Sequence, residues 1–471
     1  MSAADASRTL VLCFDGTANH FDGDNTNVVK LFELLKKDDH KVQLCYYQPG
    51  VGTYLKPGST SHWLEGAAKL LDQAVAWYLD THVTDGYQFI MRNYRPGDRI
   101  CLFGFSRGAY IARALAGFLY KTGLLPRDNF EQVTFAYRLY KRTDAKGLRL
   151  CERFKRSFCR DVKVDFVGVW DTVASVGMLR SKSLPFTAAN QCIKTFRHAL
   201  SLDEHRVKFK PNLYHRMTPE ERKLAEKEQI PERRVGKAAG TGLATTYFPH
   251  ISDTAATLVH RPFRNSRKLK KKRRESTWSE AEIQVSKHTP DPHAAPRRPG
   301  GTDVLEVWFA GCHADVGGGA VSDDTPALAD IALRWMVREV MAAQCGVLFD
   351  SDAMRRMKIP LDGVFAASPR HAPSRELALD REEAGLPIHD EMRVFPLAPV
   401  WWIAEMIPFR HMWQDGEGGW HHNSLPNFFK GRRIPDIQPN FHISVKERMH
   451  NAALHYKPKA KWKTGTEVYV E

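Results

Sequence analysis

One serine between two glycines has the residue types and spacing of a catalytic group: Gly104, Ser106 and Gly108 fit the pattern G-x-S-x-G. A continuous apolar segment over 99–104 precedes the serine, and a helical pattern over 109–120 follows it. Between a strand and a helix, this pattern is typical of a nucleophile elbow, whose glycines let the two elements approach closely. We therefore predict Ser106 as a catalytic nucleophile rather than as an ordinary helix-capping serine.

A serine hydroxyl is a weak nucleophile unless a base takes its proton, and the base needs an acid to orient it. The chain order Ser, then Asp or Glu, then His is typical of α/β hydrolases. Asp171 ends the next strong apolar segment after Ser106, and His313 follows the last such segment, shortly before three glycines. We predict Asp171 as the acid and His313 as the base.

Alternatives remain for both partners. Asp315 is the rival acid, although its place two residues after His313 favours a role in shaping the loop. His198 and His205, which we expect at a polar helix end, are the alternative bases.

Acyl transfer also needs N–H groups that stabilise the developing oxyanion. In α/β hydrolases one donor is the residue after the nucleophile, here Arg107, and the other comes from the loop after an early strand. Asp15, Gly16 and Thr17 stand in that loop, so the N–H of Gly16 or of Thr17 is the predicted second donor. We expect Asp15 and Asp315 to support the site loops. No metal or other cofactor is expected, because no Cys or His cluster has ligand spacing.

The elements that must position these residues alternate between strands and helices. Strands that are apolar on both faces and alternate with helices predict a mostly parallel sheet covered on both sides. Ligands bind beyond the carboxyl ends of such strands, and each predicted site residue follows one. We predict the α/β class, an α/β-hydrolase-like fold with a helical cap or insertions. The expected strands are 9–14, 42–47, 99–104, 162–170 and 304–310, and the expected helices are 26–37, 62–92, 109–120 and 326–343.

The 471 residues include 69 Lys and Arg against 54 Asp and Glu, a formal charge of +15. Nine of the cations fall between residues 261 and 274, with no acid among them. The surrounding segment, 255–302, lacks periodic apolar residues, so we predict a disordered basic insertion. A nuclear targeting signal and a contact with anionic membrane are the alternatives to a plain solvated loop. We expect no specific binding of nucleic acid, because no zinc-finger or RRM-type signature accompanies the cations.

The composition supports a folded, intracellular protein. Hydrophobic residues make up 43% and aromatic residues 11%, which excludes a disordered or collagen-like chain. The eight cysteines form no CxxC pair, which favours reduced thiols in the cytoplasm or nucleus. We see neither a signal peptide nor an apolar run of about 18 residues that could span a membrane.

We divide the chain into a catalytic domain at 1–350, which contains the insertion, and a C-terminal cap or extension at 351–471 that packs on it. The segment 399–409 is rich in tryptophan and apolar residues. We expect it to pack as part of the cap. The alternative is contact with lipid, because tryptophan favours membrane interfaces.

Several longer motifs follow one another along the chain: Phe14–Thr17 (FDGT), Thr26–Val28 (TNV), Tyr47–Thr53 (YQPGVGT), Gly104–Tyr110 (GFSRGAY), Val169–Val173 (VWDTV), His198–Glu204 (HALSLDE) and Phe309–Gly319 (FAGCHADVGGG). Over residues 8–345 the chain thereby resembles the DUF2235 family, the catalytic domain of Tle1-like type VI secretion phospholipase effectors, and within it the intracellular eukaryotic members. The resemblance implies an α/β-hydrolase fold and lipase or phospholipase activity through Ser106, Asp171 and His313.

Three functions compete. The leading hypothesis is a serine hydrolase that cleaves carboxylic esters of lipid-like substrates. The first alternative is a catalytically inactive binding or scaffold protein with a hydrolase fold. The second is a phosphoryl transferase of the haloacid-dehalogenase type, suggested by Asp15-Gly16-Thr17, but Cys13 stands where that chemistry needs its nucleophilic aspartate.

Overall fold

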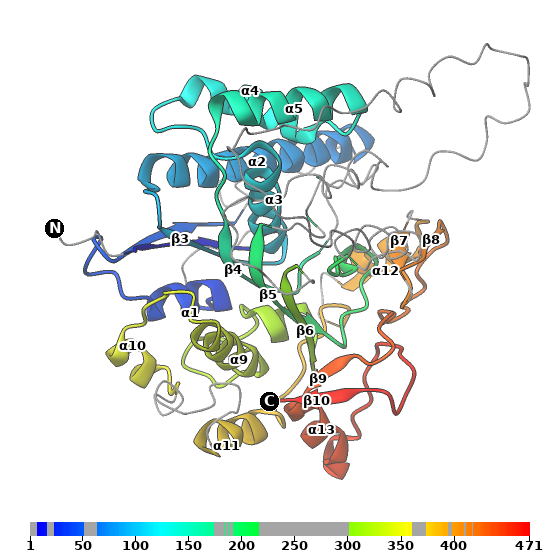
Figure 1. Cartoon of the computed structure of the whole chain (residues 1–471). Helices are drawn as coiled ribbons and strands as arrows, with labels where there is room; N and C mark the ends of the chain where they lie inside the picture. The colour runs from blue at the N-terminus through cyan, green and yellow to red at the C-terminus, as the bar shows by residue number, and fades with distance from the viewer. Residues whose placement is uncertain are drawn as a thin grey trace, which may run out of the picture. The chain divides into compact units, whose positions relative to one another are not determined.

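Eight parallel strands form the central sheet of the computed structural model, in the order β10-β9-β6-β5-β4-β3-β1-β2 (Figure 1). The sheet grows outward from β1 in both directions, with crossover connections between the strands. Such a sheet is the mostly parallel α/β architecture that the sequence predicts. Its strands are β1 (Thr9–Phe14), β2 (Gln43–Gln48), β3 (Arg99–Phe105), β4 (Val164–Trp170), β5 (Ile193–Ser201), β6 (Asp303–Phe309), β9 (Asn440–His442) and β10 (Val468–Val470).

The structure describes residues 7–16, 23–50, 64–173, 184, 187, 192–215, 301–359, 374–393, 398–408, 411–416 and 418–471. All of these belong to one compact unit, made of residues 1–216 and 278–471. The predicted basic insertion lies outside the described residues up to residue 300, and so does Thr17.

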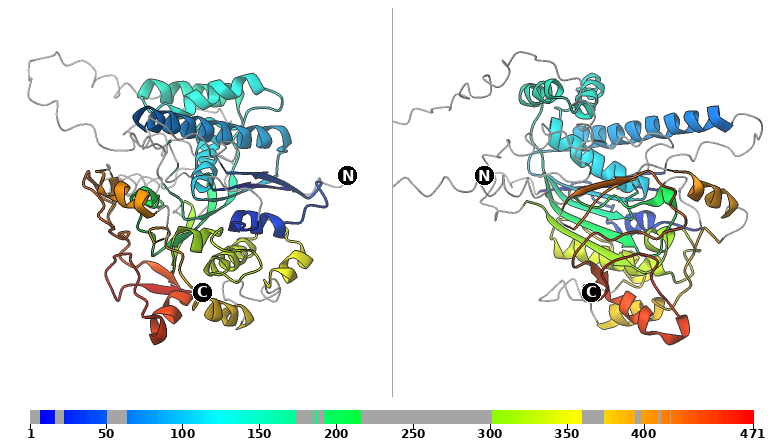
Figure 2. Two further views of the ribbon diagram at one scale, coloured as in Figure 1. Left: turned by 180° about the vertical axis from the view of Figure 1, so that it is seen from behind. Right: turned by 90° about the vertical axis from the view of Figure 1, so that its right-hand side faces the viewer.

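Helices cover both faces of the sheet (Figures 1 and 2). Helices α2 to α5 lie on one face, and α1, α9 and α10 lie on the other. Every helix and strand expected from the sequence is present, with ends shifted by a few residues. The helices are α1 (Asn27–Leu34), α2 (Leu64–Asn93), α3 (Arg107–Thr122), α4 (Phe130–Lys141), α5 (Ala145–Phe158), α8 (His313–Gly317), α9 (Leu328–Ala342), α10 (Ser351–Arg356), α11 (Ser374–Glu383), α12 (Ala398–Met406) and α13 (Ile443–His450).

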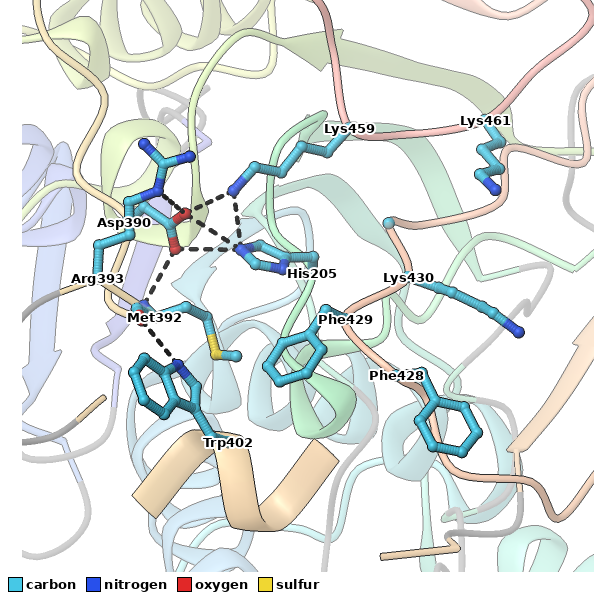
Figure 3. A pocket seen from close by; sticks show the side chains of 11 residues that line it. His205, Asp390, Met392, Arg393, Trp402, Phe428, Phe429, Lys430, Lys459 and Lys461 are labelled. Atoms are coloured by element: carbon cyan, nitrogen blue, oxygen red, sulfur yellow. Dashed lines mark hydrogen bonds and ion pairs between the residues drawn. The ribbon is translucent and has the colours of Figure 1, made fainter. Parts of the chain in front are cut away.

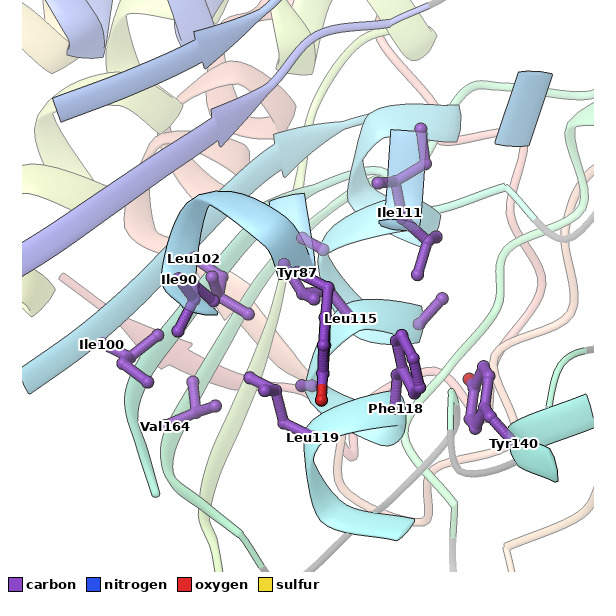
Figure 4. Packing of buried hydrophobic residues seen from close by; sticks show 14 of the residues in the cluster. Tyr87, Ile90, Ile100, Leu102, Ile111, Leu115, Phe118, Leu119, Tyr140 and Val164 are labelled. Carbon is purple, nitrogen blue, oxygen red and sulfur yellow. The ribbon is translucent and has the colours of Figure 1, made fainter. Parts of the chain in front are cut away.

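Alternate residues of the inner strands pack into two separate hydrophobic cores, one on each face of the sheet. Leu10 and Leu12 of β1 pack in the core beneath α2 and α3, where Tyr87 and Phe118 stack with ring centroids 4.2 Å apart (Figure 4). Val11, between the two leucines, packs instead in the core beneath α1 and α9. Burial on both faces explains why the strand reads as a continuous apolar run rather than as an alternating pattern.

Strand β5 corrects one expectation, because His198 lies in the middle of a buried strand and not at a polar helix end. This strand was not predicted from the sequence, because it carries charged side chains at buried positions. Arg197 donates hydrogen bonds to Glu339 at 2.5 Å and to Asp303 at 2.8 Å, and Nδ1 of His198 lies 2.9 Å from Glu306. Hydrogen-bond partners from other elements offset the cost of burying these polar groups. The hydropathy pattern of the sequence does not reveal such partners.

The C-terminal segment, expected to pack on the catalytic domain as a cap, also supplies two strands to the central sheet. Strand β9 pairs with β6, and β10 completes that edge. The segment further contains a small antiparallel sheet of β7 (His411–Gln414) and β8 (Trp420–Asn423).

Candidate active site

Ser106 stands at a sharp turn between β3 and α3. Its backbone has φ 58° and ψ −117°, a left-handed conformation that a non-glycine residue rarely adopts. A Cβ on Gly108 would overlap the backbone oxygen of Phe14, and a Cβ on Gly104 would overlap the backbone of Gly108 itself. The two glycines of the motif therefore permit the close approach of strand and helix on which the turn depends.

Asp171 and His313 meet at the carboxyl end of the sheet, 142 residues apart in the chain. Asp171 directly follows β4, and His313 is the first residue of α8, which follows β6. Nδ1 of His313 lies 2.5 Å from Oδ2 of Asp171, and both side chains are buried. A carboxylate accepts hydrogen bonds only, so the Nδ1–H donates and the lone pair of Nε2 is left for a proton.

Arg432 holds the same carboxylate from the other side. Its Nη1 donates to Oδ1 of Asp171 at 2.5 Å and its Nη2 donates to Oδ2 at 2.8 Å, while Ser201 N–H also donates to Oδ1 at 3.0 Å. Burial alone would raise the pKa of Asp171, but Arg432 and His313 outweigh burial and hold the pKa well below its usual range. Asp171 is therefore ionised and fixed in orientation.

Burial also governs the state of His313. It lowers the pKa of His313 below its ordinary value of 6.5, and the hydrogen bond to Asp171 opposes this shift without cancelling it. The imidazole is consequently neutral near pH 7, which is the form that can act as a general base.

Aromatic packing places His313 against the residue that precedes Ser106. The ring of Phe105, which directly precedes Ser106, lies 4.6 Å from the imidazole of His313. A Cβ on Gly317 of α8 would strike the Phe105 ring, so that glycine allows the contact. Within the described residues Ser106 Oγ forms no hydrogen bond. Catalytic hydrogen bonds are often long without substrate and tighten in the reacting complex.

A second set of side chains surrounds His313, and none of them was predicted as a site residue. Glu204 accepts the His313 N–H at 3.3 Å and bonds Arg206 through both carboxylate oxygens, at 3.0 and 2.7 Å. The guanidinium of Arg206 lies over the ring of Phe209, which in turn meets the imidazole edge-on at 4.8 Å. Burial would raise the pKa of Glu204, but Arg206 lowers it below its usual value. Glu204 ends the HALSLDE motif, which was the only available hint.

The proposed oxyanion donors are only partly placed. The N–H of Arg107 is at the N-terminus of α3, where the first amides have no partner within the helix. The N–H of Gly16 donates to Oδ1 of Asp15 at 2.7 Å, so it is already occupied in this structure. Asp15 also accepts from Thr26 and Tyr47, both at 2.8 Å, and thereby ties the loop after β1 to its neighbours.

Asp315 and the alternative bases have other partners. Asp315 accepts from the N–H of Cys312 at 2.8 Å and lies 2.7 Å from Nδ1 of His389, so it braces the start of α8. His198 uses both ring nitrogens, Nδ1 with Glu306 and Nε2 with the Thr172 N–H at 3.1 Å. His205 lies in a different cluster, where its Nε2 is 3.1 Å from Oδ1 of Asp390.

Over the part of the chain that the structure describes, no three His, Cys, Asp or Glu side chains are grouped so that they could hold a metal ion. Over the same residues, no helix is long and apolar enough to cross a membrane.

A protein family and a yeast protein each match most of this chain. Residues 8–339 match the family described as "T6SS, Phospholipase effector Tle1-like, catalytic domain". The uncharacterized protein YEL023C of Saccharomyces cerevisiae is 29% identical over 94% of this chain and 79% of its own length.

Two solved structures are more distant. An uncharacterized protein from Pseudomonas aeruginosa is 17% identical, with a TM-score of 0.35 over 80% of this chain, which spans about half (53%) of that protein. The Tle1 effector bound to the VgrG spike of the type 6 secretion system is 14% identical, with a TM-score of 0.35 over 90% of this chain and 92% of the effector chain.

Proposed function

Because the chain belongs to the family of Tle1-like phospholipase effector catalytic domains, we propose that it is a serine hydrolase that cleaves carboxylic esters of lipids, as a phospholipase or lipase does. Ser106 is the proposed nucleophile, His313 the base and Asp171 the acid. The observation that carries this proposal is the buried hydrogen bond between Asp171 and His313, which leaves Nε2 of a neutral imidazole available beside the strained serine turn.

The proposed reaction has two halves. Nε2 of His313 takes the hydroxyl proton of Ser106 while Oγ attacks the ester carbonyl carbon. The charge on the carbonyl oxygen is met by the Arg107 N–H together with the N–H of Thr17, or with that of Gly16 once it leaves Asp15. The protonated imidazole then gives its proton to the departing alcohol. A water molecule, activated by His313 in turn, hydrolyses the acyl–serine ester and releases the fatty acid.

A fluorophosphonate probe tests the nucleophile directly, because it forms a covalent bond only with an activated serine. The wild-type protein should label, and Ser106→Ala should neither label nor hydrolyse a soluble p-nitrophenyl ester. Loss of a nucleophilic serine typically costs about 10⁶-fold in turnover. Full activity of Ser106→Ala would refute the proposal. Absence of both labelling and ester hydrolysis in the folded wild-type protein would favour the alternative, a catalytically inactive binding or scaffold protein.

The proposal includes the setting of the enzyme. We propose an intracellular location, cytoplasmic or nuclear, with the cations of 261–274 as the segment that could direct it. A lipid or another ester is the proposed substrate. The same cations could hold the enzyme at an anionic membrane, and specific binding of nucleic acid is not part of the proposal.

A further inference from the structure

A pocket of about 570 Å³ is lined by none of the proposed catalytic residues Ser106, Asp171 and His313. Figure 3 shows the side chains that line it. The loop after β5, the segment before α12 and the C-terminal segment all contribute to its wall. Its charged and titratable lining consists of four cations, one acid and one histidine: Arg393, Lys430, Lys459, Lys461, Asp390 and His205.

The single acid of the pocket is already neutralised. Asp390 accepts a hydrogen bond from Lys459 at 2.5 Å and lies 3.1 Å from Nε2 of His205. Burial would raise the pKa of Asp390, but His205 and Lys459 outweigh burial and hold it well below its usual range. Lys430 and Lys461, by contrast, form no ion pair with any acid in the described residues. The pocket therefore has an excess of positive charge, which favours an anionic ligand.

Exposed apolar side chains surround the same pocket. Trp402, Phe428 and Phe429 line it while remaining 50%, 48% and 45% exposed. Further exposed apolar groups stand on α12 and on the neighbouring loops: Ile403 (67%), Met406 (56%), Ile407 (45%) and Leu425 (67%). A soluble protein rarely leaves so many large apolar groups together on its surface unless they meet a partner.

The turn that carries two of these side chains has an unusual backbone conformation. Phe428 and Phe429 have φ of 49° and 60°, the left-handed region that costs energy for bulky residues. Glu405, which is fully buried, stabilises this turn by accepting the Phe429 N–H at 3.0 Å. Trp402 is anchored in turn, because its Nε1 donates to the backbone oxygen of Met392 at 3.1 Å.

We propose that this pocket binds the phosphate-bearing headgroup of an anionic phospholipid within a bilayer, while the apolar side chains around it enter the membrane interface. Cations that meet headgroups beside aromatic and aliphatic groups that meet acyl chains are the pattern of an interfacial surface. The inference rests on the proposed function in one respect: a lipid hydrolase must bring its serine to an ester at the bilayer surface.

Packing connects this surface with the proposed catalytic residues. Trp401, the neighbour of Trp402 on α12, meets the ring of Phe209 edge-on at 5.6 Å. Phe209 meets the imidazole of His313 at 4.8 Å. A bilayer bound at the pocket would therefore lie within two aromatic contacts of the base.

Binding of the full chain to vesicles tests the proposal. Vesicles of phosphatidylcholine alone are compared with vesicles that also contain phosphatidic acid. Lys430→Glu combined with Lys461→Glu should weaken binding to the anionic vesicles roughly tenfold or more, since each cation near the surface contributes about 1 kcal/mol. The control is Lys146→Glu combined with Arg149→Glu on α5, which changes the net charge equally at exposed positions outside the pocket. This control should lose much less.

Apolar variants separate a membrane from a soluble ligand. Ile403→Ser combined with Met406→Ser should also weaken binding to vesicles, whereas glycerol 3-phosphate in solution should bind poorly and compete weakly. Equal losses in the pocket variant and the α5 control would overturn the proposal in favour of unspecific charge attraction. The proposal would be overturned in favour of a soluble phosphate ester if glycerol 3-phosphate bound tightly and Ile403→Ser with Met406→Ser had no effect on vesicle binding.

Two readouts keep this proposal distinct from that of the hydrolase. Ser106→Ala should bind vesicles as the wild type does, and the pocket variants should hydrolyse a soluble p-nitrophenyl ester at the wild-type rate. If Ser106→Ala remains active but the pocket variants lose vesicle binding, the hydrolase proposal fails and the membrane surface stands. If vesicle binding is unchanged in every pocket variant, the membrane surface fails regardless of activity.

Discussion

Two clusters in this molecule each combine a histidine, an aspartate and a cation. In one, His313 and Arg432 share the carboxylate of Asp171. In the other, His205 and Lys459 share the carboxylate of Asp390. Their residue types are almost the same, but their geometry differs.

The difference lies in which ring nitrogen is occupied. His313 turns Nδ1 to its aspartate, which leaves Nε2 for a proton, and Phe105 packs its imidazole beside the serine turn. His205 uses Nε2 for both Asp390 and Lys459, at 3.1 and 2.8 Å. His205 lines a pocket that Ser106 does not line, whereas His313 packs against the residue before Ser106. Composition alone therefore does not identify a candidate base; the position of the ring and the nitrogen that it leaves open do.

The largest effect should separate the two histidines. His313→Ala should lower the turnover of a soluble ester by at least about 10⁴-fold, because loss of the base disables the whole catalytic unit. His205→Ala should leave that turnover within a few-fold of wild type. Steady-state kinetics on purified variants measures both. A wild-type rate in His313→Ala together with an inactive His205→Ala or His198→Ala would move the base to the other histidine.

The two aspartates should differ almost as much. Asp171→Asn keeps the size of the side chain but favours the wrong imidazole tautomer, so turnover should fall by about 10³- to 10⁴-fold. Asp390→Asn should not slow the soluble ester. Thermal unfolding of both variants provides the control, because a folded but inactive Asp171→Asn points to chemistry and not to collapse. Should Asp315→Asn prove the damaging change instead, the acid is misassigned.

The two cations should differ in stability. Arg432 is fully buried against Asp171, so Arg432→Gln should lower the free energy of unfolding by about 3–5 kcal/mol, the usual cost of leaving a buried charge unpaired. The side chain of Lys459 is 31% exposed, so Lys459→Gln should cost at most about 1 kcal/mol. Urea unfolding measures both values. Equal losses would show that burial does not distinguish the clusters.

The pH profile reports the state of His313. The proposed base acts only when neutral, and burial lowers the pKa of His313, so kcat/KM should rise with pH through an apparent pKa below 6.5 and then level off. Below that pKa, activity should fall about tenfold per pH unit, as expected for one proton. His205→Ala should leave the profile unchanged. A midpoint above 6.5 would mean that Asp171 outweighs burial.

Chelation should have the smallest effect, namely none. The proposed nucleophile, base and acid are all side chains, so thorough treatment with EDTA should leave the turnover of a soluble ester unchanged. Loss of activity that divalent cations restore would contradict this expectation and direct attention to Asp15 and Asp315 as ligands.

Much of this architecture could be predicted from the sequence, because buried parallel strands are continuous apolar segments. The strands before Ser106, Asp171 and the His313 helix were all predictable, and so was the elbow with its glycines. Strand β5 was not, since its burial depends on charged partners from other elements.

The surroundings of the candidate site were harder to predict. Arg432 lies 261 residues after Asp171 in a segment without a recognisable pattern, and only the folded sheet edge brings the two together. Glu204 and Arg206 pair across two residues, but nothing in their spacing points to His313. The roles of Ser106, Asp171 and His313 remain predictions that the kinetic experiments address.

Because Arg432 binds the carboxylate of Asp171, the candidate site is complete only after Arg432 has been synthesised and has folded into place. During synthesis on the ribosome, Ser106, Asp171 and His313 all emerge before Arg432. Until the later segment pairs with the sheet, the carboxylate lacks the guanidinium that fixes it, together with the hydrogen bonds by which Arg432 joins Ser201 at 3.0 Å and Phe209 at 2.6 Å. A partly made chain, or one cut between α9 and Arg432, would carry every proposed reacting group and still leave Asp171 loosely held, so that the proposed ester cleavage would await a fully assembled molecule.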